Sequence, residues 1–113
     1  MPNKNELFQD TPLSQRPDTA VGIAWYLPEQ WEKLRKISAD RADLEETHAE
    51  WLAIATESLL NFKHMGITVQ PVEVDVDELA HWCKRRKRPV NATARSRFVA
   101  VKLAEHNEEL TKR

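Results

Sequence analysis

The sequence contains one sharp boundary between acidic and basic residues, and these are the side chains best suited to contact a ligand. The segment Glu73–Glu78 carries four carboxylates and no cation. The charged side chains that follow are all basic, and a basic cluster at a corner between two helices is typical of contact with nucleic-acid phosphates. One hypothesis is therefore a nucleic-acid-binding module that uses the basic segment 84–97, with contacts from Lys84, Arg85, Arg86, Lys87, Arg88, Arg95 and Arg97.

A second interpretation of the same charges involves no ligand. Acids at the start of a helix and bases at its end both complement the helix dipole, which stabilises the helix. This accounts for the charges from Asp75 to Arg88. It does not account for Arg95 and Arg97, near the start of the next predicted helix, which would then pair with acids elsewhere in the fold.

The usual metal ligands form no metal-binding pattern in this sequence. Glu73, Asp75 and Asp77 alternate, but Asp75 is better placed to cap a helix. The histidines are scattered, with no pair four residues apart and no HExxH motif: His48, His64, His81 and His106. The two glycines lie far apart, so no phosphate-cradling loop is present. We predict no metal site, no cofactor and no catalytic residue.

A third hypothesis is a small ligand-binding domain or enzyme whose site assembles only in the folded chain, from Trp25, Tyr26 and His48. An alternative role exists for the histidine, because His48 lies on the apolar stripe of a predicted helix and would hydrogen-bond a neighbour there. The tryptophans fit apolar core stripes as well. Cys83 lies mid-helix on the apolar side and is predicted to be a buried, unreactive thiol.

Apolar spacing and capping residues predict two strands and four helices. In chain order they cover residues 20–26 (strand), 28–38 and 43–64 (helices), 67–74 (strand), and 75–88 and 91–111 (helices). The fold class is therefore α+β, in β-α-α-β-α-α order around a single core. Pro71 predicts that the second strand is an edge strand or carries a bulge.

Capping residues predict where the helices begin and end. Asp43 and Glu46 form a capping-box pattern for the second helix, and Gly66 predicts its end. Asp75 predicts the start of the third helix and Asn91 the start of the fourth. The predicted core draws on every element: Ile23, Trp25, Trp31, Leu34, Leu44, Trp51, Leu52, Ala55, Leu59, Phe62, Val69, Val74, Leu79, Trp82, Phe98 and Val101.

Length and composition predict one globular domain over residues 20–113, preceded by a flexible N-terminal arm over residues 1–19. The formal net charge of −1 gives no overall attraction to nucleic acid or to an anionic membrane. The single cysteine favours the reducing cytoplasm. The longest apolar run, Trp51–Ala55, is too short to span a bilayer, and the N-terminus lacks the apolar core of a signal peptide.

Parts of the sequence resemble a group of short bacterial proteins of unknown function. The stretches that carry the resemblance are Val74–Cys83, Pro89, Ala94–Phe98, Trp25–Tyr26, Pro28–Trp31 and Ile37–Asp40. They span about residues 20–104. The resemblance implies a bacterial cytoplasmic protein, and it carries over no activity and no catalytic residue. The basic run 84–88 departs from the group.

These observations favour a non-enzymatic cytoplasmic interaction module that binds a protein partner or a second copy of itself. The basis is the lack of a catalytic pattern, together with helices that carry apolar residues on more than one face. The nucleic-acid-binding module and the ligand-binding domain or enzyme remain the alternatives.

Overall fold

The computed structural model describes residues 20–111, so the predicted arm 1–19 lies outside the described residues. Within that range the chain forms β1 (Val21–Trp25), α1 (Pro28–Ile37), the 3₁₀ turn η4 (Arg41–Asp43), α2 (His48–His64), β2 (Val69–Glu73), α3 (Val76–Arg85) and α4 (Ala92–Thr111). The predicted α+β class and element order are confirmed. None of the helices in this range is long and apolar enough to cross a membrane.

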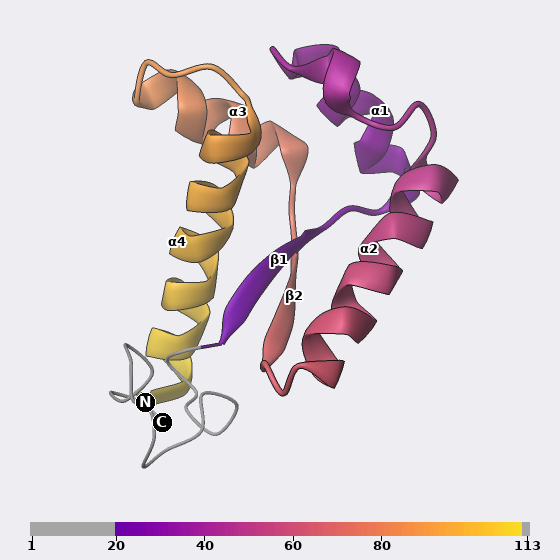
Figure 1. Ribbon diagram of the computed structural model, residues 1–113. Helices are drawn as coiled ribbons and strands as arrows, with labels where there is room; N and C mark the ends of the chain where they lie inside the picture. Colours follow the sequence, from indigo (N-terminus) through magenta and orange to yellow (C-terminus); the bar gives the residue numbers. More distant parts are fainter. Residues whose placement is uncertain (1–19, 112–113) are drawn as a thin grey trace, which may run out of the picture.

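The two strands pair in parallel and lie between two long helices (Figure 1). α4 packs against β1 on one side, and α2 lies on the other side of the strands. α2 is also the connection that returns the chain so that β2 can run parallel to β1. α1 and α3 lie at the end where both strands finish. The fold is thus a narrow sheet flanked by two helices and closed at one end by two more.

Local capping residues fix the starts of α3 and α4, as predicted. The Asp75 carboxylate accepts a hydrogen bond from the Glu78 amide at 3.1 Å. The Asn91 side-chain oxygen accepts from the Ala94 amide at 2.9 Å. Each cap satisfies an amide that the first turn of a helix leaves unpaired.

The predicted start of α2 is wrong. Asp43 lies in η4, and α2 begins at His48 with Thr47 as its cap. The Thr47 hydroxyl accepts from the Glu50 amide at 3.1 Å, and the Glu50 carboxylate accepts from the Thr47 amide at 3.3 Å. A helix from Asp43 would use the Glu45 carbonyl internally, but that carbonyl accepts the indole N–H of Trp31 at 3.1 Å. This tertiary contact joins the segment before α2 to α1, and the complete capping box at Thr47 defines the observed helix start.

The core lies where α1, α3 and the first half of α4 meet the ends of the strands. Its most deeply buried side chains are Trp31, Leu34, Val74, Val76, Leu79, Cys83 and Phe98. The prediction for Val101 is wrong: it is 36% exposed, while Val99 and Leu103 on the sheet-facing side are 4% and 8% exposed. On α2 only Ala55 is fully buried, because a two-stranded sheet is too narrow to cover the whole apolar stripe of a long helix.

Pro71 lies on an edge strand, in agreement with the prediction, and the register runs through it without a bulge. The Val21 amide donates to the Thr68 carbonyl at 2.9 Å, and the Val74 amide donates to the Trp25 carbonyl at 3.0 Å. In a parallel ladder alternate residues face the partner strand. The backbone of Pro71 therefore faces away from β1, at a position where its missing N–H costs no ladder hydrogen bond.

Helices α2 and α3 each end at a residue with left-handed backbone. Gly66 has φ +76° and follows α2, as predicted. Lys87 has φ +54° and turns the chain after α3, so this helix ends at Arg85, before the predicted limit at residue 88. The Arg88 amide donates to the Cys83 carbonyl at 3.1 Å, which closes the turn.

Candidate functional site

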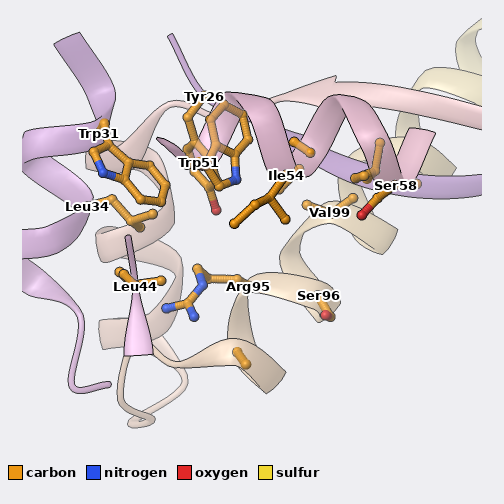
Figure 2. Close-up of a pocket in the computed structure, with 15 residues that line it drawn as sticks. Tyr26, Trp31, Leu34, Leu44, Trp51, Ile54, Ser58, Arg95, Ser96 and Val99 are labelled. Atoms are coloured by element: carbon orange, nitrogen blue, oxygen red, sulfur yellow. The ribbon is translucent and has the colours of Figure 1, made fainter. Parts of the chain in front are cut away.

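An open cleft of about 400 Å³ lies beside β1, between α2 and α4. Figure 2 shows aromatic rings at one end of the cleft and Ser58, Ser96 and Val99 at the other. The residues that line it come from five parts of the chain: Gly22, Ile23, Ala24, Tyr26, Trp31, Leu34, Leu44, Trp51, Ile54, Ala55, Ser58, Ala92, Arg95, Ser96 and Val99.

Three aromatic rings form the closed end of the cleft. Trp51 of α2 stacks on Trp31 of α1 with ring centroids 5.3 Å apart. Tyr26, just after β1, contacts both rings edge-on at 5.4 and 5.7 Å. Edge-on and offset contacts of this kind are the favourable geometries for aromatic pairs. The cluster therefore fixes α1 and α2 against the end of β1.

A partly buried ion pair lies next to the aromatic rings. The Arg95 guanidinium donates to both carboxylate oxygens of Asp40 at 2.8 and 2.9 Å. It also donates to the Ser38 hydroxyl at 3.3 Å. The hydrogen bonds from Arg95 lower the pKa of Asp40 below its usual value. Burial raises the pKa of Tyr26 to about 12, so its hydroxyl is neutral at physiological pH.

The floor of the cleft is the edge of β1 that faces away from β2, here called the open edge. Val21, Ile23 and Trp25 direct their backbone groups toward β2, so Gly22 and Ala24 direct theirs to the open edge. No strand lies on that side in the described part of the chain. A second hollow of about 260 Å³ shares Gly22 with the cleft and continues along α4 toward Ala20.

The outer wall of the cleft is apolar and partly open to water. Ile54 lines the cleft and is 49% exposed, although it is a large aliphatic side chain. Ala55 and Trp51 lie on the same side of α2, and Val99 lies on the facing side of α4. Polar groups come from Ser58, Ser96 and the paired Arg95. This composition suits contact with apolar side chains and with a polypeptide backbone.

The predicted pocket residues lie close together, but only Tyr26 lines the cleft. Trp25 lies behind the wall and packs edge-on against Trp51 at 5.4 Å. The His48 Nε2–H donates to the Tyr26 carbonyl at 2.7 Å, which is the core role predicted as the alternative for this histidine. Sequence reasoning missed Ile54, Ser58 and Ser96, because no pattern in the sequence distinguishes them from other helix-surface residues.

The fold separates Arg95 from the other predicted nucleic-acid-binding residues. Arg95 is in the cleft, paired with Asp40, as the alternative interpretation of this charge requires. Arg86, Arg88 and Arg97 surround a separate hollow at the corner between α3 and α4. The remaining three are exposed: Lys84, Arg85 and Lys87. Cys83 is buried, as predicted, and burial raises the pKa of its thiol.

Among residues 20–111, no group of three or more metal-ligating side chains is arranged to hold a metal ion. Comparisons of the chain with protein-family models, with curated proteins and with solved structures find no match. The resemblance to short bacterial proteins therefore stays a prediction.

Proposed function

We propose that this protein is a non-enzymatic interaction module of the cytoplasm that binds an extended segment of a partner protein along the open edge of β1. The observation that carries the proposal is the position of Gly22 and Ala24, whose outward backbone groups lie beside an apolar cleft. Strand addition to a sheet edge is a recurring mode of recognition, in which main-chain hydrogen bonds supply affinity and side-chain contacts supply specificity. The single cysteine supports the cytoplasmic location.

The walls of the cleft indicate the chemistry of the bound segment. Successive side chains of an added strand point in opposite directions, one toward α2 and the next toward α4. Both walls are apolar, with Ile54 on one side and Val99 on the other. The charge of Arg95 is already matched by Asp40. We therefore expect a segment with adjacent apolar residues and no charge at its centre.

The space beside β1 favours a single strand over a second copy of the fold. Side chains of both α2 and α4 line the region beyond the open edge. A second copy that paired through its own β1 would have to place its two flanking helices in that same region. One isolated strand brings no flanking helices of its own, and it would extend the sheet to three strands, which is more stable than two.

The experiment is selection of a displayed library of random extended peptides on the full chain, followed by affinity measurements on an enriched peptide. Ile54→Asp places a charge in the cleft, and Leu60→Asp is its control, because Leu60 is on the same helix, is 50% exposed and does not line the cleft. Ala24→Pro removes an outward amide without touching the ladder to β2. We expect at least tenfold weaker binding for Ile54→Asp and Ala24→Pro, equivalent to about 1.4 kcal/mol.

Hydrogen exchange identifies the contact. Binding at the open edge slows exchange of the Gly22 and Ala24 amides, since each then donates to the added strand. Enriched peptides that leave these amides unprotected, or that bind Leu60→Asp as poorly as Ile54→Asp, would show that the open edge is not the binding site. A dimer in sedimentation that Ala24→Pro dissociates would show that the partner is a second copy of the chain.

A further inference from the structure

A separate hollow with a different chemistry lies at the corner between α3 and α4. This corner hollow has a volume of about 400 Å³ and is lined by Trp82, Arg86, Arg88, Arg97, Ala100 and Val101. The ring of Trp82 packs edge-on against Phe98 at 5.6 Å, which holds α3 against α4. The left-handed turn at Lys87 reverses the chain. Basic side chains before and after this turn are thereby brought together with Arg97 of α4.

Two N–H groups at the corner hollow are buried without an acceptor. Trp82 is only 7% exposed, and its indole N–H has no hydrogen-bond partner. The Nε–H of Arg88 is also buried and unpaired. Buried donors are nearly always hydrogen-bonded in folded proteins, because an unpaired one keeps the full cost of its desolvation. Both residues line the same hollow, so an unpaired donor and a basic side chain lie close together there.

The charge at the corner indicates what kind of hydrogen-bond acceptor the hollow would bind. Arg86 lies over the ring of Trp82, with its guanidinium carbon 4.4 Å from the ring centroid. The ion pairs found within residues 20–111 use Lys33, Arg95 and Lys102, so the arginines of the corner hollow have no carboxylate partner there. Three guanidinium groups without a counter-charge favour an anion. Exposed Lys84, Arg85 and Lys87 add to the positive field.

We infer that the corner hollow is a binding site for a phosphate group, held by Arg86, Arg88 and Arg97 beside the ring of Trp82. Phosphate fits better than carboxylate because its oxygens project in several directions and can accept from donors that surround them. Arginine pairs with phosphate through two parallel hydrogen bonds. The site is separate from the cleft beside β1. The phosphate can belong to a small free phosphate or to the backbone of a nucleic-acid strand.

The inference changes the residue set that the sequence suggested for nucleic-acid contact. Arg95 leaves the set, because Asp40 neutralises it in the cleft. Trp82, which was predicted as a core residue, lines the corner hollow. The corner thus combines one defined phosphate site with a surrounding field from Lys84, Arg85 and Lys87, rather than a uniform basic patch.

The experiment is a titration of the isotope-labelled full chain with inorganic phosphate and, separately, with a short oligothymidine, observed through the indole N–H signals. The Trp82 signal is assigned with Trp82→Phe. We expect phosphate to shift this signal. Arg97→Gln should weaken binding by about tenfold, the effect of losing one charge-assisted hydrogen bond. Arg85→Gln is the matched control, because Arg85 is an exposed arginine outside the hollow. Equal urea midpoints for the two variants show that both are folded.

Inorganic phosphate and oligothymidine together distinguish a small phosphate ligand from a nucleic-acid strand. An oligothymidine that binds far more tightly than phosphate, and that loses affinity steeply between about 50 and 200 mM salt, identifies a nucleic-acid strand. Oligothymidine that binds no more tightly than phosphate identifies a small phosphate ligand. The inference is overturned if neither ligand moves the Trp82 signal at low salt. It is also overturned if Arg85→Gln weakens binding as much as Arg97→Gln, since that result describes diffuse attraction without a site.

Discussion

Arg95 and Asp40, which are 55 residues apart in the sequence, form a two-point ion pair that ties the start of α4 to the segment after α1. Their side chains are only 12% and 20% exposed. A pair with this geometry depends on both members, because removing one leaves the other charge in a poorly solvated position. The neighbouring amide of Ala39 donates to the Val90 carbonyl at 2.8 Å, so the same two segments are also joined through their backbones.

Asp40→Asn should lower the free energy of unfolding by about 2 kcal/mol at pH 7. The pKa of Asp40 is lower in the folded than in the unfolded chain, so its stabilisation is present above the unfolded value and lost as pH falls through the folded value. The difference between wild type and variant should therefore shrink at about pH 3. Urea unfolding at both pH values measures it.

Asp77→Asn is the control for that prediction. Asp77 also pairs with a cation, Lys33 at 3.1 Å, but its side chain is 78% exposed. Water and salt screen such pairs, and their loss has little effect on stability. Equal destabilisation by the two variants would contradict the importance assigned to the partly buried pair.

Tyr26 is the only tyrosine in the chain, so its ionisation can be followed by ultraviolet absorbance without interference from another phenol. Its folded-state pKa is raised to about 12 by burial. The unfolded chain loses this proton near pH 10, so folding stability should fall between about pH 10 and pH 12. Arg95→Gln should raise the pKa of Tyr26 further, because the charge of Arg95 lowers it. A native-state midpoint near pH 10 would contradict the burial of this hydroxyl.

Gly22→Ala should destabilise the fold by about 1–3 kcal/mol through overpacking. A Cβ atom at this position would lie 2.8 Å from Val99 Cγ1 and 3.3 Å from Leu103 Cδ2. Shortening Val99 makes room, so the double variant Gly22→Ala/Val99→Ala should lose less stability than the sum of the single variants. Chemical unfolding of the three variants measures the coupling.

Gly66→Ala provides the comparison for Gly22→Ala. No atom lies within 4 Å of its added Cβ, and its cost comes from the left-handed backbone, with φ +76°. That strain is about 1–2 kcal/mol and should add independently to the effect of Val99→Ala. If Val99→Ala changed the stability effects of Gly22→Ala and Gly66→Ala by the same amount, that result would argue against a specific contact between β1 and α4.

Thr47→Ala should cost about 1 kcal/mol in the free energy of unfolding, because it removes the cap of α2. Asp43→Ala should have little effect, since Asp43 lies in η4 and does not cap α2. Thermal unfolding of the two variants decides between the observed helix start and the start that the sequence favoured. A larger loss for Asp43→Ala would support the earlier start.

Features that depend on neighbours in the chain could be predicted from sequence, and features that depend on tertiary contact could not. The caps at Asp75 and Asn91 bond amides three residues away, so their residue types suffice. Two equivalent capping patterns precede α2, Asp43 with Glu46 and Thr47 with Glu50, and residue types alone do not choose between them. Val101 was predicted to be buried because α4 has apolar residues on several faces, and only the packing on β1 selects Val99 and Leu103.

The candidate site follows the same division. Trp25, Tyr26 and His48 were all predicted as pocket residues. Only Tyr26 lines the cleft, and the other two pack against Trp51. The open edge of β1 depends on the number of strands in the sheet and on which alternate residues of β1 hydrogen-bond to β2. The sequence specifies neither. The corner hollow depends on the turn at Lys87, which brings Arg88 and Arg97 to the same place. Charge alone could not separate Arg97 from Arg95, whose roles differ because only Arg95 reaches Asp40.

Pro71 and the open edge of β1 together determine how far this sheet can grow. A fibril grows only if each added molecule pairs through one strand edge and leaves a second strand edge free for the next molecule. Here the outer edge of β2 has a proline where an incoming strand would seek an amide donor. Under the proposed function, the open edge of β1 would receive a strand, while Pro71 disfavours pairing at the outer edge of β2. An asymmetric pair of edges of this kind lets a protein keep an exposed strand for recognition without polymerising through it.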